Sequence, residues 1–173
     1  WQGDIHGVHV SGCAAAQTNN NNLVASPGYN CKFLPVKIAN ASGALVAAYQ
    51  GITYAADHGC IIINCSWGGG GGGLFGQTVI NYATINKNCL VMAAAGNGGI
   101  DEAFYPASYN YVLSVCASGS TDVKAGFSSY NYTVDVMSPG NAIVSTVPTN
   151  TTSSMSGTSM ACPVAAGVAA IIK

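Results

Sequence analysis

The sequence predicts an α/β fold of three layers, in which a central, mostly parallel β-sheet lies between helices. Two apolar runs, residues 60–65 and 89–95, are typical of short strands buried on both faces. Residues 45–58 and about 77–86 carry apolar side chains at helical spacing, so strands and helices alternate along the chain. That alternation favours a parallel sheet covered by helices. Residues 111–117 and 133–137 are predicted to be further strands.

The flanking segments complete the predicted order. Residues 17–22 include four consecutive asparagines and are predicted to form a loop, whereas residues 33–38 resemble a short strand. Residues 160–172 form an unbroken apolar run that is too short to cross a bilayer, which indicates a helix buried on every face. Pro163 indicates that this helix begins only just before it, because proline is tolerated in the first turn but not deeper.

Composition bounds the class of protein. Only 6% of the 173 residues are charged and 49% are hydrophobic, whereas charged residues make up about a quarter of an average domain. The net charge of -1 gives no electrostatic basis for binding nucleic acid or an anionic membrane. The chain opens at Trp1 in mid-pattern and stops at Lys173 directly after an apolar run. We therefore expect residues 1–173 to be part of a single domain that is truncated at both ends, without a membrane span.

The seven cysteines contain no CxxC pair, which gives no support to zinc or thioredoxin-like chemistry. Most of them lie inside apolar runs, where a free cysteine behaves as a small buried hydrophobic residue. One disulfide remains possible, but a scaffold built on disulfides does not fit a chain of this length and composition.

Ser159 is the first candidate for chemistry, because it lies at or near the N-terminus of the predicted buried helix. Free N–H groups and the positive end of the helix dipole stabilise negative charge at that position. A serine there could attack a carbonyl group while its own N–H holds the resulting oxyanion. The alternative is that Ser159 is an ordinary N-cap residue.

Three segments, taken in order, resemble signature segments of the subtilisin-like serine proteases. They are residues 6–12 (HGVHVSG), residues 95–97 (AGN) and residues 157–163 (GTSMACP). The connecting stretches 30–37, 66–68, 105–107 and 137–140 agree as well, so the resemblance covers nearly the whole chain. It implies the three-layer fold of that family and a serine endopeptidase activity on polypeptides.

The resemblance assigns Ser159 as the nucleophile, His6 as its general base and Asn97 as the side-chain donor of the oxyanion hole. Taken without the other two segments, Asn97 could equally be an ordinary turn asparagine before two glycines. His9 is expected to be structural, and His58 to lie at the surface or to cap a helix end. The family's catalytic aspartate precedes the histidine in sequence. Only five residues precede His6, and Asp4 is too close to reach the far ring nitrogen, so we expect the aspartate upstream of Trp1 and little activity from this chain alone.

By the same resemblance, an extended peptide substrate would pair with the backbone of Ser66, Trp67 and Gly68. The other wall of the pocket for the residue before the cut bond would consist of Ala94, Ala95 and Gly96. Small residues in that wall are expected to leave room for a large apolar side chain. The glycine run 68–73 is expected to be a mobile rim.

No cofactor is expected for the chemistry itself. Residues 18–24 resemble a loop that binds calcium in many relatives, although Leu23 stands where a glycine is usual, so a structural calcium ion is possible. Members of the family are mostly secreted and made with a pro-segment, which favours an extracytoplasmic location. The resemblance also suggests a cis peptide bond at Tyr105–Pro106.

Two other classes of protein share features with this sequence. Gly68, Gly70 and Gly73 match the G-x-G-x-x-G pattern of nucleotide-binding domains, but a run of six glycines matches it almost automatically, and the next strand has no acidic residue to hold a ribose. A catalytically inactive relative is the second class. The presence of His6, Asn97 and Ser159 together argues against it.

Overall fold

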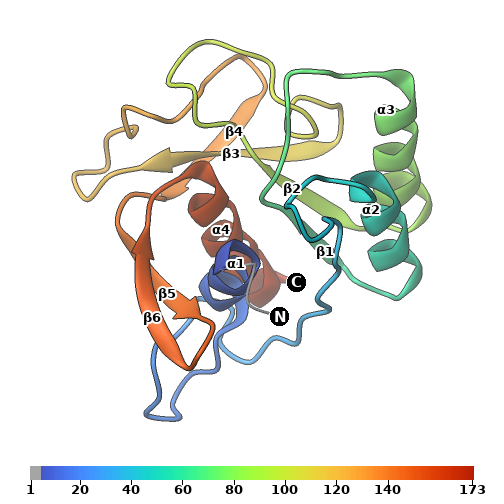
Figure 1. Ribbon diagram of the computed structural model, residues 1–173. Coiled ribbons are helices and arrows are strands. Elements are labelled where there is room, and N and C mark those ends of the chain that lie inside the picture. Colours follow the sequence, from blue (N-terminus) through green and yellow to red (C-terminus); the bar gives the residue numbers. More distant parts are fainter. Residues whose placement is uncertain (1–4) are drawn as a thin grey trace.

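The computed structural model describes residues 5–173, so Asp4 lies outside the described residues. Its centre is a four-stranded sheet of β1 (Ile62–Cys65), β2 (Leu90–Ala94), β3 (Val112–Ser118) and β4 (Val134–Pro139), shown in Figure 1. The strands lie in the order β1-β2-β3-β4 and every neighbouring pair is parallel. The predicted parallel sheet is confirmed, with strand bounds within two residues of those expected.

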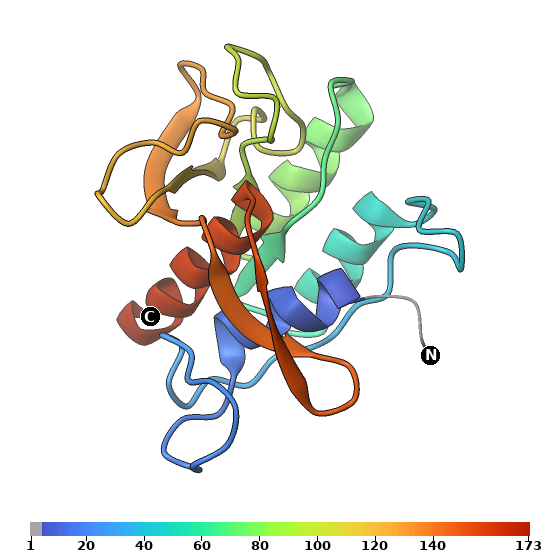
Figure 2. The ribbon, with the colours of Figure 1, turned by 60° about the vertical axis from the view of Figure 1, so that its left-hand side comes forward.

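Helices cover both faces of this sheet, as predicted (Figure 2). On one face lie α2 (Ala48–Asp57) and α3 (Leu74–Asn81), and α3 continues into the π-helical turn Tyr82–Asn86. On the other face α4 (Thr158–Ile172) contacts all four strands, and α1 (Ile5–Ala15) packs against α4. The three-layer α/β architecture is therefore confirmed.

Two hydrophobic clusters, one on each face, hold these layers together. Ile52 and Ile80 of the α2–α3 layer pack against Val91 of β2, and all three are almost wholly buried. On the opposite face the small residues Ala161 and Cys162 of α4 pack against Val115 of β3 and have no exposed surface. Small side chains on this stretch let α4 lie close to the sheet, which places its N-terminal turn directly beyond the strand ends.

The sequence patterns did not predict the antiparallel hairpin of β5 (Ile143–Val147) and β6 (Thr151–Met155). Residues 151–155 are almost all serine and threonine and show no apolar alternation. The hairpin is instead held against α1 by polar contacts. Ser145 Oγ donates a hydrogen bond of 2.8 Å to the carbonyl oxygen of His9, a contact between residues far apart in sequence.

The predicted strand at residues 33–38 is wrong, because these residues form no regular strand. The Ile38 carbonyl instead accepts hydrogen bonds from the N–H groups of Val46 and Ala47, at the start of α2. Gly51 of α2 leaves space for the side chains of Val36 and Ile38. The run is therefore bonded to the segment that follows it rather than to the sheet.

Two expectations about the last helix also require correction. Helix α4 begins at Thr158, so Pro163 lies in its second turn and not in its first. The helix is not buried on every face, since Ile171 and Ile172 in its last turn are 62% and 81% exposed. Within residues 5–173 no helix is both long and apolar enough to cross a membrane. The Tyr105–Pro106 peptide bond is cis, as predicted.

Candidate active site

The candidate site lies where two neighbouring strands end at the same edge of the sheet. Because β1 and β2 are parallel and Cys65 pairs with Ala93, the segments that follow them emerge side by side. These segments are residues 66–68 and residues 95–97. The N-terminal turn of α4 contacts both of them, so Ser66, Asn97 and Ser159 are brought together from three separate parts of the chain.

Ser159 is the second residue of α4, and the residue that precedes the helix is Gly157. The N-cap alternative for Ser159 is therefore wrong. Its Oγ donates a hydrogen bond of 3.3 Å to the backbone carbonyl of Ser66, across the end of β1. The N–H of Ser159 belongs to the first turn, where the helix itself offers no acceptor and where the helix dipole favours negative charge.

A second hydrogen bond, in the opposite direction, also joins Ser66 and Ser159. In a regular helix the Ser159 carbonyl would accept the N–H of residue 163, but Pro163 has none. The Ser66 hydroxyl instead donates to that carbonyl at 2.9 Å, and it accepts a bond from Asn64 Nδ2 at 3.0 Å. Ser66 is buried, so its side chain satisfies an acceptor that neither the helix nor bulk solvent would satisfy.

Asn97 is fixed by Thr158, the first residue of α4. Its Oδ1 accepts hydrogen bonds from the Thr158 N–H at 2.8 Å and the Thr158 hydroxyl at 3.0 Å. Because a backbone N–H can only donate, the atom facing it must be the amide oxygen, which leaves the Nδ2 donor of Asn97 directed away from Thr158. The side chain thus bonds to the helix and not to its own turn, unlike an ordinary turn asparagine.

A further pair of residues, which the sequence analysis missed, supports the loop that carries Asn97. Ser129 donates its N–H to the Gly96 carbonyl at 3.0 Å, and its Oγ accepts the Gly98 N–H at 2.8 Å. Glu102 in turn accepts the Ser129 hydroxyl at 2.5 Å. Ser129 has no exposed surface and lies thirty-two residues away in sequence, so no local pattern could have identified it.

The three histidines have different environments. His6 is exposed on the first turn of α1, and α1 packs against both α4 and β5. His9 is completely buried, with its Nε2 3.1 Å from the carbonyl oxygens of Ile143 and Ser153. His58 follows α2, and its Nδ1 lies 2.7 Å from the Tyr54 carbonyl. The structural role expected for His9 and the helix-capping role expected for His58 are confirmed.

The proposed substrate walls are close together but the space between them is not empty. A Cβ placed on Gly96 would lie 3.1 Å from Cγ of Phe104, and one placed on Gly68 would lie 2.8 Å from Cδ1 of the same ring. The ring of Phe104 therefore occupies the room that the small residues were expected to leave. Trp67, the middle residue of the segment 66–68, packs its ring edge-on against Tyr49 with centroids 5.5 Å apart.

The glycine run after β1 is bonded to the protein at two points. Gly69 and Tyr105 exchange two backbone hydrogen bonds of 2.8 and 2.9 Å, and the Gly73 N–H donates to the Tyr109 hydroxyl at 2.9 Å. Gly72 packs on the Tyr105 ring. Two of the backbone donors in this run are thus bonded within the chain, which argues against a phosphate-binding loop.

The asparagine loop fits a calcium ion only in part. Asn19, Asn21 and Leu23 have φ of 56°, 56° and 51°, in the left-handed region that favours glycine, which explains why a glycine is usual at position 23. Residues 17 and 19–25 line a hollow of about 320 Å³ but include no carboxylate. Nor do residues 5–173 contain a cluster of three or more His, Cys, Asp or Glu side chains that could hold a metal. The loop could therefore supply a calcium ion with neutral oxygen ligands only.

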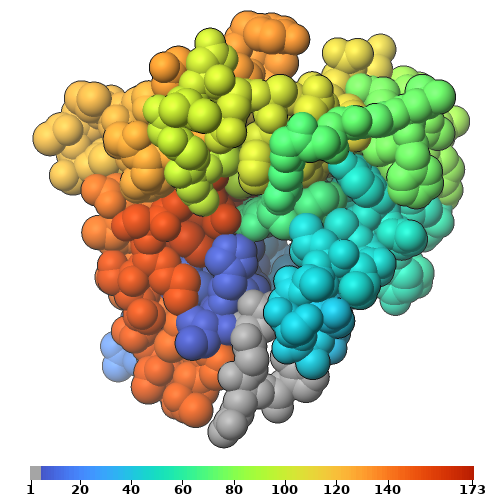
Figure 3. Space-filling model, turned by 45° about the horizontal axis from the view of Figure 1, so that its top comes forward, coloured from blue at the N-terminus to red at the C-terminus, as the bar shows by residue number. Residues whose placement is uncertain are grey.

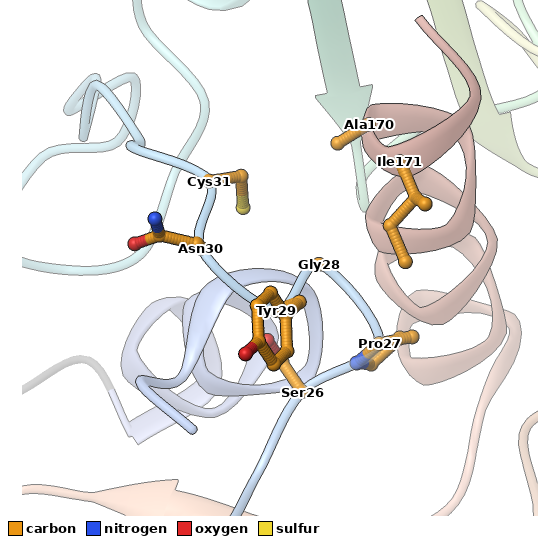
Figure 4. A pocket seen from close by; sticks show the side chains of 8 residues that line it. All are labelled: Ser26, Pro27, Gly28, Tyr29, Asn30, Cys31, Ala170 and Ile171. Carbon is orange, nitrogen blue, oxygen red and sulfur yellow. The ribbon is translucent and has the colours of Figure 1, made fainter. Parts of the chain in front are cut away.

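A larger hollow lies away from Ser159. It has a volume of about 460 Å³ and lies between residues 26–31 and the C-terminal end of α4 (Figure 4). Its lining includes Pro27, Tyr29, Cys31 and Ile171 but no histidine, carboxylate or lysine. On another face, the start of α1, the glycine run and the loop after β2 come to the surface together (Figure 3).

All seven cysteines lie in the described part of the chain, and none of them forms a disulfide. Cys65 and Cys162 flank the candidate site from β1 and α4 and are almost wholly buried. Burial raises the pKa of the Cys65 thiol to about 12 and raises that of Cys162 as well. Both thiols are thus inert hydrophobic groups at neutral pH.

Comparison with known proteins defines the class that this fold and site represent. The model of the subtilase family matches residues 2–173, and the chain therefore belongs to that family. Thermitase of Thermoactinomyces vulgaris is 44% identical over 172 residues, which are 98% of this chain and 61% of thermitase. A thermophilic serine proteinase of a Bacillus species is 45% identical over 169 residues, which are 96% of this chain and 42% of that protein.

Solved structures agree with these relatives. A protease of Pseudoalteromonas arctica superposes with a TM-score of 0.90 at 33% identity, over 97% of this chain and 58% of that one. The prenylagaramide maturation protease superposes with a TM-score of 0.89 at 30% identity, over 97% of this chain and 63% of that one. The chain thus spans roughly 42–63% of the length of the proteins it resembles.

Proposed function

We propose that the complete protein containing this chain is a serine endopeptidase that hydrolyses peptide bonds in polypeptides. The observation that carries the proposal is the pair of hydrogen bonds from Thr158 to Asn97 Oδ1. They leave the Asn97 amide donor beside the N-terminal turn of α4, where the Ser159 N–H is a second donor. Two such donors at a helix N-terminus suit the oxyanion of an acyl-transfer reaction.

In the proposed reaction the Ser159 oxygen attacks the substrate carbonyl carbon while His6 accepts the Ser159 proton. The carbonyl oxygen takes up the negative charge and receives the Asn97 and Ser159 donors. Collapse of this intermediate breaks the C–N bond, and His6 returns the proton to the leaving amine. Water then attacks the acyl-enzyme by the same route and releases the acid.

The proposed general base needs a third group to hold its ring. In this family that group is an aspartate located before the histidine in sequence, and we place it upstream of Trp1 in the complete protein. Residues 1–173 are then part of one peptidase domain. The relatives extend well beyond the matched region, which supports this arrangement.

The substrate would be an extended polypeptide that pairs with the backbone of residues 66–68, while residues 94–96 form the other wall of the pocket for the residue before the cut bond. Both segments lie at the carboxyl ends of neighbouring parallel strands, which supports their placement on two sides of one site. Nucleic acid is not a proposed partner, because the net charge is -1. A pro-segment and an extracytoplasmic location are proposed by family membership, and one relative is named a cell wall-associated protease of Bacillus subtilis.

A structural calcium ion at residues 18–24 is a secondary proposal. It would be held by asparagine and backbone oxygens alone, because the loop has no carboxylate. No step of the proposed reaction involves it.

The test compares a form of the protein that includes the upstream aspartate with residues 1–173 alone, on an unfolded protein substrate. The longer form should cleave the substrate and be labelled at Ser159 by a serine-directed phosphonate. Ser159→Ala should abolish both signals, whereas Ser120→Ala, at an exposed serine, should leave them unchanged. The shorter chain should lose about 10⁴-fold or more in kcat, a size borrowed from loss of the aspartate in a subtilisin. Equal activity of both forms would contradict the upstream aspartate, and cleavage that survives Ser159→Ala would contradict the proposed nucleophile.

A further inference from the structure

The side chain of Phe104 lies between the two proposed walls of the substrate pocket. One edge of its ring, Cγ and Cδ2, lies 3.1 and 3.2 Å from where a Cβ of Gly96 would be. The other edge, Cδ1 and Cε1, lies against Gly68, where a Cβ would overlap it. The ring therefore bridges the segment after β1 and the segment after β2, and the absence of side chains at both glycines is what admits it.

The backbone that carries this ring is fixed on both sides. Phe104 donates its N–H to the Ser108 hydroxyl at 3.1 Å and accepts the Ser108 N–H at 2.8 Å. The next residue, Tyr105, exchanges backbone hydrogen bonds of 2.8 and 2.9 Å with Gly69, directly beside Gly68. A substrate cannot push Phe104 aside by moving the backbone without breaking these bonds. It can displace the ring only by side-chain rotation, which would lose the packing against both walls.

We propose that Phe104 closes the pocket for the residue that precedes the cleaved bond, so that the protease prefers substrates with a small residue there. Alanine, glycine and serine project little beyond their Cβ and leave the ring undisturbed. Leucine or phenylalanine would need the volume that the ring already occupies. Phe104 is thus a specificity-determining residue of the activity proposed above, and the preference depends on that activity.

Most of the other residues assigned to the pocket walls are small. Residues 94–96 and Gly68 are alanines and glycines, and the ring of Trp67 packs against Tyr49. The ring of Phe104 is among the nearest neighbours of both Gly68 and Gly96. A single extra or missing methylene in a hydrophobic pocket changes kcat/KM by about 10- to 200-fold, and a phenyl ring differs from a methyl group by more than that.

The experiment uses the complete enzyme and two tetrapeptide anilides that differ only in the residue before the cleaved bond, alanine or phenylalanine. The wild type should hydrolyse the alanine substrate with the higher kcat/KM. Phe104→Ala should raise kcat/KM for the phenylalanine substrate by about tenfold or more, while the alanine substrate changes by about threefold or less. Phe104→Leu, which keeps more of the packing, should shift the ratio in the same direction by less.

Tyr132→Ala is the matched control, because Tyr132 is 99% exposed and its truncation should leave the substrate ratio unchanged. Circular dichroism checks that each variant is folded. If Phe104→Ala does not fold, the substrate ratio of Phe104→Leu provides the test. A wild type that prefers the phenylalanine substrate, or a Phe104 variant with an unchanged ratio, would overturn the role of Phe104 and leave the protease function intact. A complete enzyme that cleaves neither anilide nor an unfolded protein would overturn both.

Discussion

Ser66→Ala tests whether the side chain that directly follows β1 replaces the hydrogen bond that Pro163 removes from α4. In the wild type the Ser66 hydroxyl donates to the Ser159 carbonyl at 2.9 Å, and the proline cannot supply an N–H in its place. Alanine leaves that carbonyl unsatisfied, and it also removes the acceptor of Asn64 Nδ2. Ser66 is 9% exposed, so water compensates poorly.

The expected loss of stability follows from the hydrogen bond that the Ser159 carbonyl loses. A buried acceptor left without a donor costs about 1–3 kcal/mol. For a domain of this size each kcal/mol corresponds to a fall in Tm of about 2–4 °C, so Ser66→Ala should lower Tm by about 2–12 °C. The expected effect on kcat is larger than on KM, because the serine nucleophile lies on the turn that relaxes, and a small misplacement of a reacting group can cost about 10²-fold.

The assay is thermal unfolding together with kcat and KM of the complete enzyme. Ser66→Thr keeps a hydroxyl and should retain most of the stability, and Ser120→Ala should behave as the wild type. The sharpest comparison is the double variant Ser66→Ala, Pro163→Ala, in which residue 163 regains an N–H for the Ser159 carbonyl. It should be more stable than Ser66→Ala alone, with a coupling energy of about 0.5–3 kcal/mol. Additive effects of the two substitutions would refute the idea that Ser66 and Pro163 act on the same carbonyl.

Asn97→Ala in the complete enzyme should lower kcat by about 10²–10³ with little change in KM, a size taken from a subtilisin rather than worked from this structure; an unchanged kcat would remove Asn97 from the oxyanion hole. Cys65 and Cys162 should resist a thiol reagent at pH 8 until the protein is unfolded, and rapid native labelling of either would contradict their burial. Because burial raises both thiol pKa values, the stability they contribute is present below the ordinary thiol pKa and is lost as pH rises above it, which alkaline unfolding curves of Cys162→Ala would measure. If calcium binds residues 18–24 through neutral oxygens alone, millimolar Ca²⁺ should raise Tm and EGTA should reverse the rise, whereas an unchanged Tm would exclude the ion.

Much of the fold could be predicted because it depends on patterns among residues that are close together in the sequence. Residues 60–65 and 89–95 are apolar on both faces, and only a strand covered by two layers can bury such a run. The helical spacing of apolar residues in 45–58 predicts one of the helices that cover the sheet. The prediction of secondary structure failed where the local pattern was weak or pointed to the wrong structure. Residues 151–155 lack apolar alternation, and residues 33–38 have a strand-like composition but make their backbone bonds to the start of α2.

The sequence by itself determined which chemical groups this protein has and the order in which they occur: a histidine, an asparagine and a serine in three segments typical of one protease family. The tertiary structure alone decided what those groups contact. It brings Thr158 to Asn97 and Ser66 to Ser159, and it places Phe104 between two glycines twenty-eight residues apart. These contacts join residues that are distant in sequence, and they form only when the strand ends, the loops and the start of α4 are packed together. For that reason the site's residue types could be predicted from the sequence, whereas the support of its nucleophile and the size of its pocket could not.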